Sequence, residues 1–212
     1  MGLYSPLVWD SLPSIQGEGL TSNNNPYILP TLDIFPALDT RSLALISIIT
    51  ALAVVSRVGL AALPNVKLNS FLTMVSGILA GPKAGFTVGF LSILISDMAF
   101  FGLGFWTPIT SFFMGLSGLL AGLLWHNRGS LSRFELALGG LLITLFYDIA
   151  TSILTMIPFV KPETLIYTAL VGLFIPCPYP MGPAHELTTA LLMGMLSPSI
   201  IHVIRGVERG EK

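Results

Sequence analysis

The sequence predicts an all-α integral membrane protein: a six-transmembrane-helix bundle with a short extra helical segment before the last span and an irregular N-terminal extension. Only 10% of the 212 residues are charged and 53% are hydrophobic, with a mean hydropathy of +0.81. Soluble domains carry about 25% charged residues, so a mainly water-soluble fold is excluded. The apolar stretches are long and lack the period-two alternation of strands, and lipid permits only helices or closed barrels.

Residues 1–40 are expected to form an irregular extension at one membrane face. This stretch holds no Lys or Arg, and five prolines together with the run Ser22-Asn23-Asn24-Asn25 interrupt any periodicity. A secretory signal peptide needs a basic segment followed by an apolar core, and neither is present. The predicted six-helix transmembrane domain therefore covers residues 41–212.

The apolar stretches after Arg41 define the predicted spans. They cover about 41–63, 68–80, 84–101, 108–126, 134–158 and 184–204, and a shorter apolar segment at about 164–176 precedes the last of them. A straight span needs about 20 residues, so 68–80 is short and 164–176 is expected to be re-entrant or covered by protein. Thr107-Pro108 is typical of an N-cap followed by proline at the first helical position.

The basic residues predict the orientation in the cell membrane. With six spans, one face carries seven of the ten basic residues: Arg41, Lys83, Arg128, Arg133, Arg205, Arg209 and Lys212. The other face carries Arg57, Lys67 and Lys161. This asymmetry predicts a multi-pass protein with both termini in the cytoplasm.

Three charged residues fall inside predicted spans, where each costs roughly 2.5–3.5 kcal/mol at mid-helix. At 1.5 Å per residue, Asp97, Asp148 and Arg57 each lie about 20–24 Å from the cytoplasmic end of their helix. Further polar groups gather at the outer loops and helix ends, among them Asn65, Lys67, Asn69, Trp106, Thr107, Thr110, Lys161, His185 and Glu186. The pattern predicts a polar cup that opens to the outside above an apolar plug.

A different interpretation remains for several of these residues. Arg57, Asp97 and Asp148 can form a buried ion network that only fixes helix packing. Glu186 can be favoured simply by its place at a helix start, and Trp106 can be an interfacial aromatic residue.

Small residues predict close contacts between helices. Ala44, Ser47 and Ala51 share one stripe of the first helix, which could pack internally or meet another protein. Three further small-residue pairs have the spacing of close helix packing: Gly85 with Gly89, Gly118 with Gly122, and Ala190 with Gly194.

Catalytic and cofactor signals are weak, and we expect no cofactor, no metal site and no catalytic residue. His126, His185 and His202 lack metal-ligand spacing, and no nucleophile elbow or phosphate-binding loop is present. The single cysteine, Cys177, excludes an intramolecular disulfide. A net charge of −1 argues against nucleic acid as a partner.

Four motifs, in their order and spacing, resemble the substrate-binding S components of energy-coupling-factor (ECF) transporters. They are Leu63-Pro64-Asn65-Val66-Lys67, Gly81-Pro82-Lys83-Ala84-Gly85-Phe86, Trp106-Thr107-Pro108 and a late His185. The resemblance covers roughly residues 44–204. Thr110 and Glu186 with Thr188-Thr189 depart from the family pattern, and both departures fall in the expected cup.

The resemblance implies a substrate-capture subunit that binds a vitamin or similar micronutrient from outside. It would dock on a transmembrane coupling protein that bears two cytoplasmic ATPases, through the small-residue stripe at Ala44, Ser47 and Ala51. The ligand would be held by Asn65, Lys67, Asn69, Trp106, Thr107 and His185, to which the polar cup adds Arg57, Asp97, Asp148 and Glu186.

The ligand stays open at this point, because cobalamin, riboflavin-like and queuosine-precursor-like compounds all suit a polar cup with a tryptophan; the motif pattern favours a cobalamin-type relative. Two other functions also stay open. One is a membrane enzyme that uses His185, Glu186 and Asp148 on a lipid-linked substrate, which requires these groups within hydrogen-bond reach. The other is a solitary ion-driven carrier, which predicts internal inverted repeats that the sequence does not show.

Overall fold

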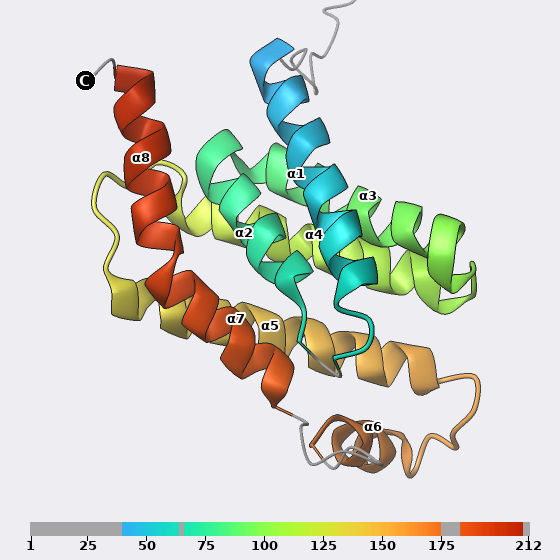
Figure 1. Cartoon of the computed structure of the whole chain (residues 1–212). Coiled ribbons are helices and arrows are strands. Elements are labelled where there is room, and N and C mark those ends of the chain that lie inside the picture. The colour runs from blue at the N-terminus through green and yellow to red at the C-terminus, as the bar shows by residue number, and fades with distance from the viewer. Residues whose placement is uncertain (1–39, 64–65, 175–182, 210–212) are drawn as a thin grey trace, which may run out of the picture. The chain divides into compact units, whose positions relative to one another are not determined.

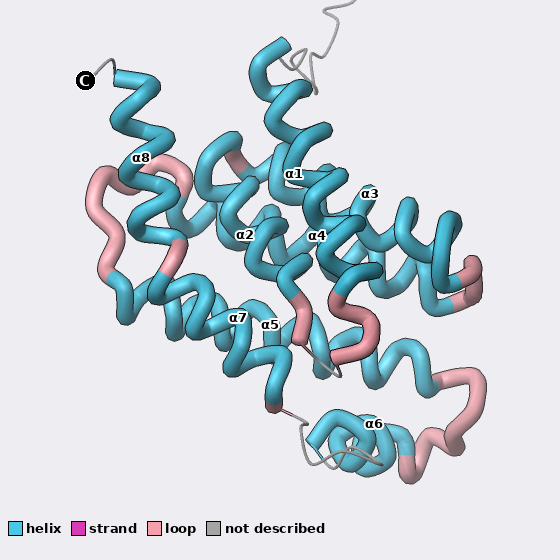
Figure 2. The backbone as a smooth tube through the Cα atoms, in the orientation of Figure 1, coloured by secondary structure: helices cyan, strands magenta, loops and turns pink. Residues whose placement is uncertain are grey.

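The computed structural model describes residues 40–63, 66–174 and 183–209, which belong to one unit of the chain, residues 38–212. The described residues form helices and loops without strands (Figures 1 and 2). The predicted extension over residues 1–40 therefore lies outside the described residues except for Thr40. The helices are α1 (Thr40–Gly59), α2 (Leu68–Ala80), α3 (Pro82–Ser96), the π-helical turn η1 (Asp97–Phe101), α4 (Trp106–Trp125), α5 (Arg133–Met156), α6 (Leu165–Phe174), α7 (Ala184–Met195) and α8 (Ser197–Arg209).

Four helical segments within the described residues are long and apolar enough to cross a membrane. They are Ser42–Gly59, Pro82–Phe101, Trp106–Trp125 and Arg133–Met156, and the bent pair α7 and α8 gives a fifth if it counts as one span. The all-helical, multi-pass class predicted from composition is therefore correct, whereas the count of six spans is not confirmed.

Helix α2 lies at the centre of the bundle. All residues from Asn69 to Ile78 are buried, because the helix packs against α1, α3, α4, α5, α7 and α8. Its apolar side chains join the main hydrophobic core, which includes Phe71, Met74, Ile78, Leu136 and Met193. A helix covered by protein on all sides does not need the full length of a lipid-facing span.

The predicted small-residue contacts are confirmed at the α3–α4 crossing. A Cβ atom built on Gly85 would lie 2.4 Å from the carbonyl oxygen of Gly118, and one built on Gly118 would lie 2.3 Å from the carbonyl oxygen of Gly85. Gly89 and Gly122 make similarly close approaches to backbone atoms of the facing helices. Helices α3 and α4 therefore pack backbone against backbone, as small-residue pairs permit in membranes.

The single helix predicted over 184–204 is wrong, because the structure divides this segment into α7 and α8. Helix α7 ends at Met195 and α8 begins at Ser197, with a bend of 42° between them. Figure 1 shows the change of direction between α7 and α8. Pro198 lacks an N–H group and its ring obstructs the preceding turn, so a continuous helix would be disrupted here. In the first turn of a new helix the same proline is well tolerated.

Two predicted helix boundaries near the cup also differ. Helix α1 ends at Gly59 rather than near residue 63, and α4 begins at Trp106, so that Thr107 is inside the helix and is not its N-cap. The hydroxyl of Thr107 has a different partner, the carboxylate of Asp97.

Candidate functional site

A cavity of about 510 Å³ lies where the C-terminal ends of α1 and α3 meet the N-terminal ends of α2 and α4 and the second half of α5. Its volume is in the usual range for small-molecule sites, about 300–1,000 Å³. Six of the polar residues that predicted the cup line it: Arg57, Lys67, Asn69, Trp106, Thr110 and Asp148. The sequence-based cup and this cavity thus coincide in part.

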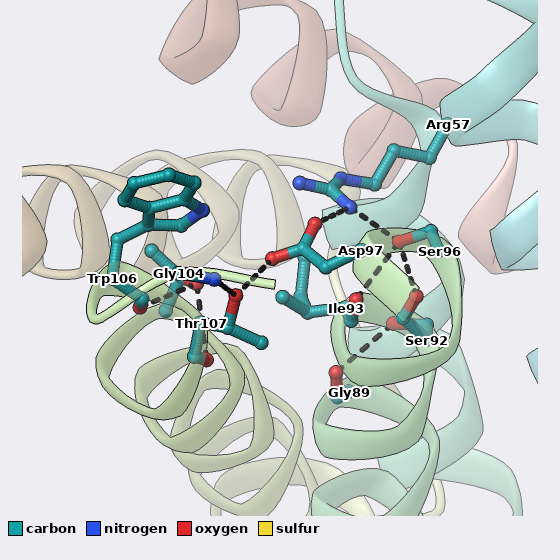
Figure 3. A network of polar contacts seen from close by, with 10 residues as sticks. Arg57, Gly89, Ser92, Ile93, Ser96, Asp97, Gly104, Trp106 and Thr107 are labelled. Atoms are coloured by element: carbon teal, nitrogen blue, oxygen red, sulfur yellow. Dashed lines mark hydrogen bonds and ion pairs between the residues drawn. The ribbon is translucent and has the colours of Figure 1, made fainter. Parts of the chain in front are cut away.

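Arg57 is held by a buried partner (Figure 3). Its Nη1 atom donates to Asp97 Oδ1 at 2.5 Å and also to the hydroxyl of Ser96. Asp97 is completely buried, whereas the side chain of Arg57 is 25% exposed. The guanidinium also lies over the ring of Phe101, 4.6 Å from its centroid, within the range of a cation–π contact. The arginine thus presents a fixed positive charge to the cavity.

The second oxygen of Asp97 holds the turn before α4. Thr107 Oγ1 donates to Asp97 Oδ2 at 2.8 Å and accepts a hydrogen bond from the Gly104 N–H at 3.2 Å (Figure 3). Both carboxylate oxygens are therefore used inside the protein, and neither Asp97 nor Thr107 lines the cavity. Their geometry suits a support for Arg57 and the adjacent turn.

The local backbone explains how Asp97 reaches this position. The chain from Asp97 to Phe101 forms a π-helical turn, closed by a 2.7 Å bond from the Gly102 N–H to the Asp97 carbonyl oxygen. Gly102 has a φ of 85°, a conformation that glycine adopts without strain. Such single π-helical turns are frequent at functional sites.

Trp106 stands at the edge of the cavity and is 42% exposed. Its ring packs edge to face against Phe105, with centroids 5.4 Å apart, and Phe105 makes a similar contact with Phe159. The ring also covers Gly104, where an added Cβ would lie 2.4 Å from it. A flat ligand in the cavity would therefore meet an aromatic wall.

Asp148 lines the cavity from α5 and is bound from behind by His185 of α7. The distance from His185 Nδ1 to Asp148 Oδ2 is 2.7 Å, and His185 Nε2 is 2.7 Å from Ser70 Oγ. His185 and Ser70 are 1% and 2% exposed, and neither lines the cavity. Asp148 therefore faces the cavity while its two supporting residues are inside the protein.

Asn69 and Lys67 complete the polar wall from the start of α2. Asn69 is 1% exposed, and within the described residues both of its side-chain amide atoms are buried without a hydrogen-bond partner. An unpaired buried amide costs free energy, and at the cavity wall the Asn69 amide is able to donate to and accept from a bound molecule. No carboxylate of the described chain forms a salt bridge with Lys67.

The structure places Glu186 differently from the prediction. Glu186 is buried but does not line the cavity, and neither of its carboxylate oxygens has a hydrogen-bond partner in the described chain. It is therefore not joined to the His185–Asp148 pair, as the proposed enzyme site would require. Asn65 lies outside the described residues.

Much of the α5 wall was not predicted from the sequence. The cavity is also lined by Phe105, Tyr147, Thr151, Ser152 and Thr155. The spacing of Asp148, Thr151, Ser152 and Thr155 places these polar residues on one face of a helix, and this signal was available in the sequence. Thr110, by contrast, was predicted in the cup as a departure from the family pattern, and it does line the cavity.

The predicted partner stripe is exposed. Ala44, Ser47 and Ala51 are open on the surface of α1. Ser47 and Ala51 line a largely apolar groove of about 540 Å³, whose other wall is formed by Leu91 and Ile95 of α3 and by Phe100 of η1. Among the described residues, none therefore covers the stripe.

Comparison with known sequences adds one family. The sequence model of the family described as "ECF-type riboflavin transporter, S component" matches residues 37–177, which is more than half of the chain. The match includes every described residue that lines the cavity, from Arg57 to Leu173, and ends before α7. No curated protein matches the sequence significantly.

Proposed function

Because the chain belongs to the ECF-type riboflavin transporter S component family, we propose that it captures riboflavin or a closely similar flat nutrient in the cavity of Arg57, Lys67 and Asp148. Members of this family are transporter subunits rather than enzymes. The observation that carries the proposal is the cavity itself, in which the buried amide of Asn69, without a hydrogen-bond partner among the described residues, lies beside fixed charges of both signs.

The chemistry of the walls suits such a ligand. Trp106 and Phe105 offer an aromatic surface for a flat ring system. Arg57 and Lys67 supply hydrogen-bond donors for carbonyl oxygens, whereas Asp148 accepts from N–H or O–H groups. A volume of about 510 Å³ favours a riboflavin-sized molecule over cobalamin, because a corrin ring with its nucleotide loop is much larger.

We further propose the membrane arrangement. Six segments cross the bilayer if α2 and the bent pair α7 and α8 are added to the four long spans. The excess of basic residues at the end opposite the cavity then places both termini in the cytoplasm and opens the cavity to the outside. Residues 1–40 remain proposed as an extension outside this six-helix domain.

The binding assignment is tested with riboflavin and purified protein in lipid nanodiscs. Wild-type protein should quench flavin fluorescence on binding. Lys67→Met should weaken binding roughly 10- to 100-fold, because a hydrogen bond to a charged group is worth about 1.5–3 kcal/mol. Lys161→Met removes an exposed lysine away from the cavity and should bind like wild type.

The outcome also separates the alternative ligands. If wild-type protein does not bind riboflavin, the proposed ligand is wrong, and mass spectrometry of co-purified small molecules would reveal a corrinoid or a queuosine precursor instead. If Lys67→Met and Trp106→Ala both bind as tightly as wild type, the cavity is not the binding site.

The partner is proposed to be a transmembrane coupling protein with two ATPases that packs into the α1–α3 groove at Ser47 and Ala51. Ala51→Phe should fill this groove, so that riboflavin binding is retained while ATP-dependent uptake by cells that express the partner subunits falls at least tenfold. Leu52→Phe enlarges a neighbouring exposed residue outside the groove and should not change uptake. Equal uptake by both variants would refute this docking face.

A further inference from the structure

His185 does not line the cavity, whereas Asp148, to which it is hydrogen-bonded, does. The imidazole lies between Asp148 Oδ2 and Ser70 Oγ, 2.7 Å from each through its two ring nitrogens. Its exposure is 1%, and only Asp148 of these three residues lines the cavity. Any effect of His185 on a bound molecule must therefore pass through Asp148.

We propose that His185 is a positioning residue, which holds Asp148 as a hydrogen-bond acceptor for an N–H or O–H group of the ligand. This inference rests on the proposed function of the cavity. The bond from His185 uses Oδ2, so the other oxygen, Oδ1, is the atom assigned to the ligand. This role differs from the one that the family resemblance implied for His185, which was direct contact with the substrate.

The surroundings of the ring determine its protonation pattern. A carboxylate only accepts, so Nδ1 carries the proton and donates it to Asp148, which leaves Nε2 to accept from the Ser70 hydroxyl. The alternative acceptor for that hydroxyl is the sulfur of Met114 at 3.8 Å, and thioether sulfur is a weak acceptor. Tyr147 packs edge to face on the ring, with centroids 6.0 Å apart, and restricts its rotation.

A second cavity residue, Arg57, is also held by a residue that does not line the cavity. Arg57 is held by Asp97, which is buried and bound in turn by Thr107. The cavity therefore presents one fixed donor, Arg57, and one fixed acceptor, Asp148, each supported by a residue behind it. A ligand that carries an acceptor at one end and a donor at the other is bound in a single orientation.

The Ser70–His185–Asp148 chain has the connectivity of a serine hydrolase triad, but it lacks access for a substrate. Ser70 is 2% exposed and does not line the cavity. A nucleophile must approach the reacting atom within about 3–3.5 Å, which the position of Ser70 inside the protein prevents. The chain therefore orients a carboxylate and has no nucleophilic role.

The first test compares binding of riboflavin with that of two analogues, each lacking one kind of donor: riboflavin methylated at the imide N3, and lumiflavin, which lacks the ribityl hydroxyls. Asp148→Asn should lose the preference for riboflavin over one of them. His185→Leu should lose the preference over that same analogue and bind riboflavin roughly 10- to 100-fold more weakly.

Rescue distinguishes positioning from a general effect on folding. His185→Asn keeps an N–H donor near the place of Nδ1 and should recover most of the affinity and the analogue preference that His185→Leu loses. His202→Asn, on the exposed side of α8, is the matched control and should behave like wild type. Wild-type affinity in His185→Leu, or lost preference against a different analogue than in Asp148→Asn, would overturn the proposal.

The second test needs no ligand. In ¹⁵N-histidine NMR spectra of the free protein, one imidazole should show the neutral form protonated at Nδ1; its signals should vanish in His185→Asn and shift in Asp148→Asn. A His185 protonated at Nε2 alone would overturn the proposal. If wild-type protein fails to bind riboflavin, the proposed ligand is wrong. The NMR experiment still decides whether His185 holds Asp148.

Discussion

Arg57→Ala is expected to lower the free energy of unfolding by about 3 kcal/mol, because removal of the arginine leaves the buried charge of its partner uncompensated. The partner left behind is Asp97, which is completely buried and accepts from Arg57 at 2.5 Å. Thr107 would still donate to its second oxygen, but a hydroxyl does not neutralise a carboxylate. Thermal unfolding in detergent should show a midpoint lower by roughly 10 °C.

A second variant shows whether the buried charge is the cause. Asp97→Asn removes the charge and keeps a polar side chain of the same shape, so Arg57→Ala combined with Asp97→Asn should be more stable than Arg57→Ala alone. Arg128→Ala is the matched control, because its pair with Glu135 is exposed (57% and 37%) and such pairs contribute at most about 1 kcal/mol. Strictly additive effects of Arg57→Ala and Asp97→Asn would show that the two side chains are not coupled.

The sequence predicted that the intramembrane charges gather at one depth but could not predict how they pair. Charge in lipid is costly enough that each residue needs a partner, and the rise of a helix converts position into depth. Arg57 pairs with Asp97 and Asp148 with His185, which depends on how α1, α3, α5 and α7 are rotated about their axes. That rotation is fixed by packing between helices, which a single sequence does not reveal.

The polar face of α5 shows why polar residues at helical spacing were not sufficient to predict the cavity wall. Thr151 and Thr155 follow Asp148 at helical spacing. Their hydroxyls also donate to backbone carbonyl oxygens one turn earlier, that of Tyr147 at 2.8 Å and that of Thr151 at 2.7 Å. A hydroxyl in a membrane helix can be satisfied locally in this way, so its presence alone does not indicate a cavity. The π-helical turn at Asp97 had no signal in the sequence except Gly102, which ends it.

The largest effect outside the cavity is expected from Gly118→Ala, although it adds one methyl group. The new Cβ would lie 2.3 Å from the carbonyl oxygen of Gly85 and 2.8 Å from Cγ2 of Thr73. The first contact is with backbone, which no rotamer change can relieve, so α3 and α4 must separate and lose contact along their length. We expect the free energy of unfolding to fall by about 3 kcal/mol, at the upper end of the usual cost of overpacking.

Gly206→Ala in α8 should not lower the free energy of unfolding. A Cβ there meets nothing within 4 Å, and alanine is favoured over glycine in a helix by about 0.8–1.0 kcal/mol. Unfolding midpoints measured in one detergent should therefore fall for Gly118→Ala and stay level or rise for Gly206→Ala. If Gly118→Ala is as stable as Gly206→Ala, α3 and α4 do not pack backbone against backbone, and the turn of Asp97 and Trp106 between them is not held as described.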